Sequence, residues 1–461
     1  MAGTYHIWTI GCQMNAADSR HLAQQLEFVG YQPVAQPEAA DLVVLNTCVV
    51  RQQSEDKAVG RLTTLARVKQ EERPGMIISL MGCMVGTKEA ESLRQRYPYV
   101  DVFLPPSETA PLLDLLQARG LFAEVRETEQ RDRALREAVQ DEDLPLPAEA
   151  RGRSVLADVP VVLGCSHACT FCVIPYRRGA ERSRPLDEIR REIDSLARQG
   201  VREIMLLGQI IDRYGVDFAD GTDLSDLLRA AARVDGIERV RFMTSHPNYL
   251  TDALLETVAR EPKVCPHIEV AVQSGSDTVL DRMRRGYTAE QYRTLVGRIR
   301  SIVPDAAIHT DIIVGFSGET EAEFQDTVSL IRDLRHDKVH ISRYSERPKT
   351  IAARRLPDDV PLEVKEQRWH ELDAVQVAIL EEQNRALRGQ TVQVLVEGRQ
   401  KGRWRGRTRH GKLVFFDDPA DRLGQLVDVQ LEWTGPFTMI GRPAAPATPA
   451  LRGRAIPVLA T

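Results

Sequence analysis

Near the start of the chain, three short apolar runs each end in a cysteine, and each is followed by a helical pattern. The runs read HIWTIGC, DLVVLNTC and MIISLMGC. Apolar runs of this length that alternate with amphipathic segments predict βα units around a parallel sheet. This alternation constrains the fold most strongly, because it recurs along most of the chain.

The cysteines that end these runs are candidate functional residues. The loops at the carboxyl ends of parallel strands line the binding crevice of such a sheet. Cys12, Cys48 and Cys83 fall there, so we expect them to converge in space. The simpler interpretation is that each is a small apolar residue at a buried strand end, but it explains one such position more easily than three.

A second series of apolar runs follows a charged, proline-containing segment at residues 121–150, which lacks periodicity and predicts a linker. The alternation then resumes with VPVVLGC, EIMLLGQ, RVRFMTSHP, HIEVAVQSG, AIHTDIIVGF and KVHISRYS. Six βα units predict a partial TIM-type barrel, with its chemistry at the carboxyl ends of the strands.

Short strands separated by turn residues complete the chain and predict a small β-barrel. We therefore predict an α/β protein with an N-terminal parallel-sheet βα domain, a central partial (βα)6 barrel and a C-terminal β-barrel. The expected boundaries are 1–120 for the first domain, 121–150 for the linker, 151–385 for the barrel, 386–445 for the small β-barrel and 446–461 for a mobile tail.

The composition and the cysteine content indicate the cellular compartment. The chain has 461 residues with 28% charged residues and a formal net charge of -5. No apolar stretch approaches the roughly 20 residues needed to cross a bilayer, and the N-terminus lacks a secretory pattern. We expect a cytoplasmic protein that does not associate with a membrane. Seven cysteines in a reducing compartment indicate metal or redox chemistry more than disulfide bonds.

The segment GCSHACTFC places Cys165, Cys169 and Cys172 at CxxxCxxC spacing after the first barrel strand. Thiolates are ligands for zinc or iron-sulfur clusters. A structural zinc site closes with four protein ligands, yet no fourth cysteine is near, and His167 is poorly placed to complete it. Three cysteines on a 4Fe-4S cluster would leave one iron free to bind a substrate or cofactor.

This spacing, with Phe171 just before the third cysteine, resembles the radical S-adenosylmethionine (SAM) superfamily. The resemblance implies that the open iron chelates SAM and that an electron from the cluster cleaves it. It also implies cofactor contacts at several strand ends, although packing and turn formation are the alternative role there. The candidates are Phe171, Gln209, Ser245, Gln273 and Ser274, with Gly315 admitting the adenine close to the backbone.

The resemblance extends over nearly the whole chain. The segments NTCVVR, GCMVG, GCSHACTFCVIPYRRGAERSRP, VQSGSD, DIIVGFSGET and GKLVFF are similar to those of the methylthiotransferases, most closely the MiaB-like tRNA branch. In that family the N-terminal cysteines hold a second 4Fe-4S cluster, which also has an iron without a protein ligand. The implied reaction adds a methylthio group to carbon 2 of N6-dimethylallyl adenosine beside the tRNA anticodon. A low-potential electron donor protein and a monomeric state are further expectations.

A basic stripe at residues 398–412 points to RNA, because it contains seven Lys or Arg and no acid. Its module resembles a TRAM domain. A solvated charged face is the alternative. The expected RNA contacts are Arg403, Trp404, Arg405, Arg407, Arg409 and Lys412, with Trp404 as a stacking platform. Arg177 and Arg178 are expected to hold phosphates of the anticodon loop, or else to be surface charges.

Two segments depart from the family pattern. Ile210 and Ile211 replace a usual asparagine and valine in a loop expected to overlook the active site, so this departure bears on the substrate. YSERPKTIAA replaces a typical YSPRPGTPAA, and we expect this to be only a changed surface loop. The alternatives are therefore a methylthiotransferase for threonylcarbamoyl adenosine or for an aspartate of a ribosomal protein. A non-catalytic iron-sulfur RNA-binding protein is a further alternative, but its clusters should be fully ligated by cysteine. Cys265 matches no cluster role and is expected to be a buried apolar residue.

Overall fold

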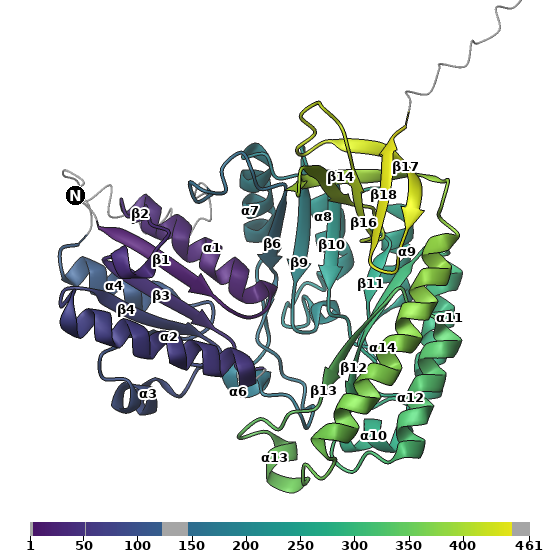
Figure 1. The fold of residues 1–461 in the computed structure, drawn as a ribbon, viewed down its shortest axis with the longest axis horizontal. Coiled ribbons are helices and arrows are strands. Elements are labelled where there is room, and N and C mark those ends of the chain that lie inside the picture. Colours follow the sequence, from purple (N-terminus) through teal and green to yellow (C-terminus); the bar gives the residue numbers. More distant parts are fainter. Residues whose placement is uncertain (1–2, 51, 122–145, 445–461) are drawn as a thin grey trace, which may run out of the picture.

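The computed structural model describes residues 3–50, 52–121 and 146–444, which form three units (Figure 1). An N-terminal α/β unit lies beside a central barrel, and a small β-barrel lies at one end of the central barrel. Most of the predicted linker and the predicted tail fall outside the described residues.

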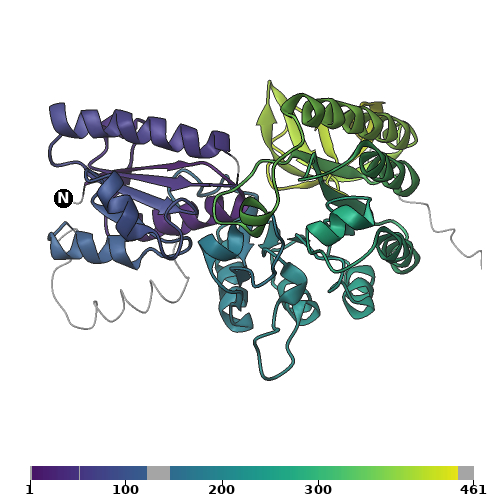
Figure 2. The same ribbon diagram turned by 90° about the horizontal axis from the view of Figure 1, so that it is seen from below.

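The N-terminal unit is a five-stranded parallel sheet in the order β2-β1-β3-β4-β5. Its strands are β1 (Thr4–Thr9), β2 (Gln32–Pro33), β3 (Leu42–Thr47), β4 (Ile77–Gly82) and β5 (Val102–Leu104). One face is covered by α1 (Gln13–Phe28) and α4 (Ala110–Ala118), and the other by α2 (Gln52–Glu71) and α3 (Ala90–Arg96) (Figure 2). Both faces are buried because the strand side chains alternate between the two helix layers.

The central unit has six parallel barrel strands in two three-stranded sheets, β6-β9-β10 and β11-β12-β13. The strands are β6 (Leu156–Pro160), β9 (Glu203–Leu207), β10 (Arg239–Met243), β11 (His267–Glu269), β12 (Ala307–Val314) and β13 (Lys338–Arg343). Isolated bridges from Val240 to Val264 and from Ser245 to Val270 join the two sheets. The prediction of a partial (βα)6 barrel is therefore confirmed.

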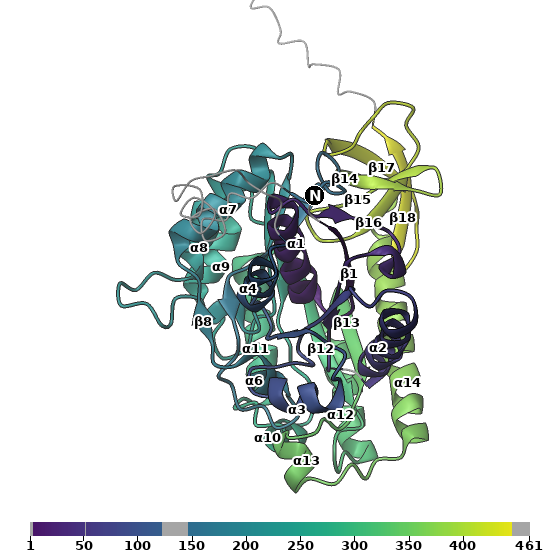
Figure 3. The same cartoon turned by 90° about the vertical axis from the view of Figure 1, so that its left-hand side faces the viewer.

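Helices cover the outside of this barrel. They are α7 (Leu186–Arg198), α8 (Leu224–Ala232), α9 (Asp252–Arg260), α10 (Asp277–Arg282), α11 (Ala289–Ile302) and α12 (Glu321–Leu334), while α14 (Leu362–Arg385) packs along β13. None of the described helices is long and apolar enough to span a membrane. On the opposite side, α1 of the N-terminal unit packs against β6 (Figure 3). Arg20 on α1 forms an ion pair of 3.0 Å with Glu192 on α7.

The first barrel strand differs from the expectation. The apolar run VPVVLGC was expected to form it, but β6 ends at Pro160, and the next residues form β7 (Val162–Leu163). That short strand pairs antiparallel with β8 (Arg182–Ser183). The run therefore divides because its second half pairs with the segment that follows the cysteine loop, so β7 and β8 fix both ends of residues 164–181.

The C-terminal unit is a closed barrel in the order β14-β15-β16-β18-β17. Its strands are β14 (Thr391–Gln400), β15 (Arg403–Arg407), β16 (Leu413–Phe416), β17 (Leu426–Thr434) and β18 (Thr438–Pro443). It docks at the amino ends of the central strands through buried arginines. Arg239 donates to the Arg407 carbonyl at 2.6 Å, and Arg241 donates to the Thr408 carbonyl at 2.7 Å.

Candidate active site

The three N-terminal cysteines lie together at the carboxyl edge of the sheet. Cys12 caps the start of α1, and Cys48 and Cys83 follow β3 and β4. Burial, together with the nearby thiols of Cys48 and Cys12, raises the pKa of the Cys83 thiol to about 11. Gly11 has a φ of 145°, and a Cβ there would lie 2.9 Å from the Cys48 Cβ. Only glycine allows the loop to bring these cysteines so close.

A buried arginine from the central unit contacts this N-terminal triad. Arg178 lies at the end of α6 (Ile174–Arg178), directly after the second cysteine loop, and its side chain is 2% exposed. Its guanidinium hydrogen-bonds the Cys83 side chain and donates to the Asn15 side-chain oxygen at 2.9 Å. It also pairs with Asp18 at 3.4 Å. A fixed positive charge therefore lies against the thiols, and the triad is tied to the barrel.

Neither Arg177 nor Arg178 has the position expected of an RNA contact. Arg178 is buried, and Arg177 pairs with Glu89 of the N-terminal unit at 2.6 Å with only 12% of its side chain exposed. The prediction that they hold phosphates is wrong in this structure, because both guanidinium groups form ion pairs with residues of the N-terminal unit.

The second triad lies in the loop between β7 and β8. The Cys165 amide donates to the Gly179 carbonyl at 3.0 Å, which closes the loop. Burial, together with the thiols of Cys169 and Cys165, raises the pKa of the Cys172 thiol to about 12. His167 lies beside the triad, with its Nδ1 at 3.4 Å from the Cys169 sulfur and its ring tilted against that of His246.

This triad also has a buried arginine against it. Arg285 donates from Nη1 to the Cys169 sulfur at 3.1 Å and from Nη2 to the Ala271 carbonyl at 2.8 Å. Its Nε donates to the Tyr287 hydroxyl at 2.8 Å. Sequence reasoning missed Arg285, because 116 positions separate it from Cys169 and no local motif marks it.

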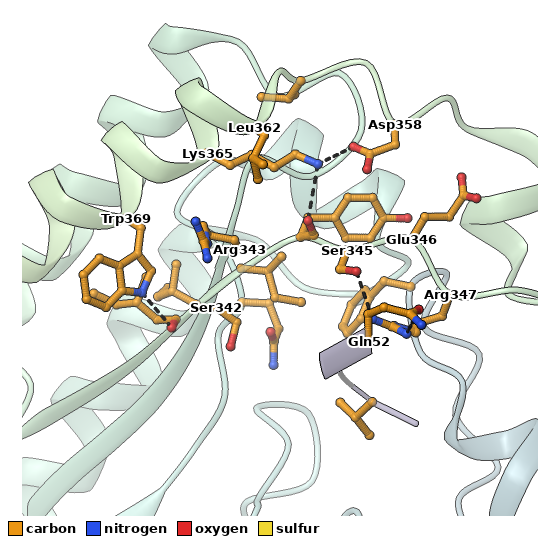
Figure 4. Close-up of a pocket in the computed structure, with 18 of the residues that line it drawn as sticks. Gln52, Ser342, Arg343, Ser345, Glu346, Arg347, Asp358, Leu362, Lys365 and Trp369 are labelled. Atoms are coloured by element: carbon orange, nitrogen blue, oxygen red, sulfur yellow. Dashed lines mark hydrogen bonds and ion pairs between the residues drawn. The ribbon is translucent and has the colours of Figure 1, made fainter. Parts of the chain in front are cut away.

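A cavity of about 1130 Å³ is lined by Cys172 of the second triad and by residues close in sequence to Cys48. Phe171 and Cys172 line it on the barrel side, and Val50 and Gln52, which follow Cys48, line it on the side of the N-terminal unit. Figure 4 shows Arg347 reaching Gln52, and the distance from Nη1 to Oε1 is 3.1 Å. Residues adjacent to both triads therefore face the same space.

The predicted cofactor contacts divide into two groups. Phe171 and Gln273 line the cavity. Gln209 is half-buried just beyond β9, and the buried Ser245 hydroxyl has no hydrogen-bond partner among the described residues. These four positions remain open to a ligand.

The other two predicted positions, Ser274 and Gly315, lie against other residues of the protein. Ser274 is fully buried; its hydroxyl lies 3.2 Å from that of Thr327 and accepts the Ser276 amide, so it cannot reach a ribose. Gly315 has a φ of 70°, and a Cβ there would lie 2.3 Å from the Lys365 Cγ. Lys365 therefore occupies the space where a side chain at position 315 would lie, and an adenine contact at the Gly315 backbone stays a prediction. The prediction for Ser274 is wrong in this structure.

The loop after β9 does overlook the second triad. Ile210 is 7% exposed and packs in one cluster with Cys165 and Ile174. Asp212 accepts the His246 amide at 3.0 Å, and burial raises the pKa of its carboxyl to about 8. Part of this loop therefore contacts the cysteine site directly.

Asp212→Asn should make the protein more stable at higher pH. Between about pH 4 and pH 8 the unfolded chain has lost this proton while the folded chain keeps it, so stability falls as pH rises. Asparagine keeps an acceptor for the His246 amide without this cost. Thermal melts of the variant and the parent should differ more at pH 8 than at pH 5.5, by on the order of a few degrees. A difference in melting temperature that does not change with pH would contradict a raised pKa of Asp212.

Most of the predicted RNA contacts in the C-terminal unit have other roles. Trp404 is 6% exposed in the β-barrel core, and its indole donates to the Asp418 carbonyl at 3.0 Å. Arg409 donates to the Val264 carbonyl at 2.8 Å, and Lys412 donates to Asn384 at 2.9 Å. Arg407 pairs with Glu397. The prediction of a stacking platform at Trp404 is wrong. Arg407, Arg409 and Lys412 contact other groups of the protein instead of facing solvent alone.

Arg403 and Arg405 keep more exposure. Arg403 is exposed and pairs with Asp417 at 3.3 Å, and Arg405 is half-exposed near Gln400. Both lie on β15, next to the exposed Arg399 at the end of β14, whose guanidinium lies over the Trp404 ring, and the exposed Lys401 in the turn between the strands. The free part of the basic stripe is therefore the β14–β15 hairpin.

Comparison with protein families matches three segments. Residues 159–331 match the radical SAM superfamily, residues 385–443 the TRAM domain, and residues 4–105 the uncharacterized protein family UPF0004. Among solved structures, the radical SAM methyltransferase TsrM from Kitasatospora setae is similar in fold, with a TM-score of 0.55 and 16% identity over 77% of each chain. The central unit is thus a radical SAM domain.

Curated relatives define the family more narrowly. The chain is 44% identical over 442 residues to the tRNA-2-methylthio-N(6)-dimethylallyladenosine synthase of Chloroflexus aurantiacus, covering 95% of this chain and 91% of the relative. The synthase of Herpetosiphon aurantiacus is 42% identical, with 95% and 96% covered. The chain belongs to this family of radical SAM tRNA methylthiotransferases.

Proposed function

We propose that this protein transfers a methylthio group to carbon 2 of N6-dimethylallyl adenosine in tRNA. The relatives are named for this product, and their similarity spans nearly the whole chain. The structural observation that carries the proposal is a pair of separate cysteine triads beside one cavity, which Cys172 and residues near Cys48 line. Such an arrangement suits a reaction that needs both a radical source and a sulfur carrier at one substrate.

The cysteines fit two 4Fe-4S clusters. Each triad supplies three thiols, the soft ligands that such clusters use, and each would leave one iron without a cysteine. Cys165, Cys169 and Cys172 would hold one cluster, and Cys12, Cys48 and Cys83 the other. When bound, the first supplies the electron that cleaves SAM, and the second supplies a site for sulfur.

The protein prepares both sites electrostatically. Burial keeps the free Cys83 and Cys172 thiols protonated, so cluster binding must release protons. Arg178 and Arg285 each place a buried guanidinium against one of the sulfurs. These charges stabilise thiolates and favour the bound form. Both arginines are positioning residues, because they act through the cysteines.

Cross-domain contacts hold the two sites on opposite sides of the cavity. Arg177 and Lys349 both pair with Glu89, and Arg347 reaches Gln52. Lys349 belongs to the loop that departs from the family pattern and has a φ of 73°. The change from glycine therefore adds an ion pair between units, although we expected only an altered surface loop.

Four residues are proposed to contact SAM. Phe171 and Gln273 line the cavity, Gln209 is half-buried just beyond β9, and the buried Ser245 hydroxyl has no hydrogen-bond partner among the described residues. For tRNA, the exposed cations of the β14–β15 hairpin, Arg399, Lys401 and Arg403, are proposed to contact phosphates. A low-potential electron donor, a monomeric state and a cytoplasmic location complete the proposal.

The test is an anaerobic assay with mass spectrometry of digested nucleosides. The reconstituted protein is incubated with reductant, SAM and tRNA that carries either dimethylallyl or threonylcarbamoyl adenosine. A methylthio mass increase only on the dimethylallyl nucleoside is expected. An increase only on the other nucleoside would show that the loop containing Ile210 changes specificity. If neither nucleoside gains mass, cleavage of SAM is measured next. Cleavage would indicate an enzyme that modifies a ribosomal protein, and no cleavage would indicate a non-catalytic binding protein.

A further inference from the structure

We propose that this protein has a third metal site, which binds one first-row divalent ion on Glu269, His309 and His340. One ligand atom from each side chain lies within 4.8 Å of the others. Two imidazoles and a carboxylate are a ligand set for zinc or ferrous iron, and they differ from the soft thiols of the cysteine triads.

The backbone places these three side chains on one face. Glu269 on β11 lies beside His309 on β12, and His340 on β13 lies beside Asp311, two residues beyond His309. Residues two apart on a strand point the same way, so His309 and Asp311 share a face with their neighbours. Three adjacent strands therefore contribute one ligand each to the barrel interior.

A neighbouring histidine, His267, orients one of the proposed ligands. His267 Nε2 lies 3.1 Å from His309 Nδ1, so this hydrogen bond leaves His309 Nε2 free for an ion. Ligating histidines commonly use their other ring nitrogen in this way, which fixes the ring orientation.

The Glu269 carboxylate gives independent evidence for a bound cation. Glu269 is 6% exposed, and its Oε2 has no hydrogen-bond partner among the described residues. Its Oε1 has only a long contact of 3.5 Å from the Thr244 hydroxyl. An unsatisfied buried carboxylate oxygen is costly, and a bound cation would remove that cost.

Charges of both signs surround the site. The Asp311 carboxylate lies near Glu269 and adds a second negative charge beside it. Two of the nearby cations have acidic partners, because Arg241 pairs with Glu203 at 2.7 Å and Lys412 pairs with Asp337 at 3.5 Å. Lys338 lies over the Phe437 ring and, with Lys412, adds positive charge near His309.

The three side chains must contract to close around an ion. In the tetrahedral geometry of zinc, bonds of about 2.0–2.1 Å put ligand atoms about 3.4 Å apart. The three ligand atoms lie within 4.8 Å of one another, so side-chain rotations must bring the most distant pair together by up to about 1.4 Å. His340 is exposed, and Asp311 beside it lines the large cavity, which provides a path for entry. A bound ion would cross-link β11, β12 and β13 just below that cavity.

The test uses the cluster-loaded protein and Zn²⁺. The protein is incubated anaerobically with Zn²⁺, desalted, and measured by elemental analysis and zinc X-ray absorption. About one zinc per chain is expected, with nitrogen and oxygen neighbours at about 2.0–2.1 Å. Glu269→Gln and His340→Asn should each reduce zinc retention by about 10-fold or more.

His340→Asn changes an exposed side chain and so keeps the fold, and circular dichroism checks this. His336→Asn, which removes a buried histidine outside the site, is the control and should retain zinc. The proposal is overturned if zinc is not retained, if its neighbours are sulfur at about 2.3 Å, or if both ligand variants retain it as the parent does.

Discussion

Cys165→Ala should reduce reductive cleavage of SAM by more than about 100-fold. The change removes a ligand from the proposed radical cluster, and even the loss of outer partners of metal ligands commonly costs 10–100-fold. The loop itself should keep its shape, because the Cys165 backbone amide, not its side chain, donates to Gly179. The measurement is 5'-deoxyadenosine formed under reducing conditions, together with bound iron per chain.

Cys265→Ala is the matched control for this variant. Cys265 is fully buried in the same unit, but the second triad does not include it. Its replacement should leave cleavage within about twofold of the parent. Cleavage at the parent rate by Cys165→Ala, with full iron content, would show that the CxxxCxxC loop does not hold the radical cluster.

Cys48→Ala should separate the two halves of the reaction. It removes a ligand of the proposed second cluster, so methylthio product should fall by more than about 100-fold. SAM cleavage should stay within about threefold of the parent, because the other triad is intact. The two products, 5'-deoxyadenosine and methylthio nucleoside, are measured in the same anaerobic reaction.

The ratio of these products distinguishes the mechanism from a folding defect. A partly unfolded variant would lose both products together, whereas loss of one cluster loses only the nucleoside. Full product formation by Cys48→Ala would contradict the two-cluster proposal. Because Arg178 links the N-terminal triad to the barrel, the variant should still melt within a few degrees of the parent.

Sequence reasoning worked best where chemistry depends on local spacing or on strand ends. The grouping of Cys165, Cys169 and Cys172 follows from three residues in one short loop. The grouping of Cys12 and Cys48 follows from the rule that parallel strands end at one edge. The family resemblance predicted the fold and the reaction class, and the comparisons confirm both.

Sequence reasoning failed where a charged or aromatic residue was assigned to the surface by its type alone. Trp404 lies between Arg403 and Arg405 on β15, and strand alternation puts it in the core with both arginines outside. That alternation was visible in the sequence and could have corrected the prediction. Nothing comparable marked Arg178, whose burial depends on a partner in another domain.

The βα alternation, the grouping of the cysteines and the family could be predicted from the chain alone, because they depend on periodicity, strand ends and short spacing. The groups that lie against the triads are set by the folded structure. Arg285 reaches Cys169 across 116 positions, and Glu269, His309 and His340 meet from three strands. Such contacts are set by strand register and domain docking, and no local pattern in the chain records either.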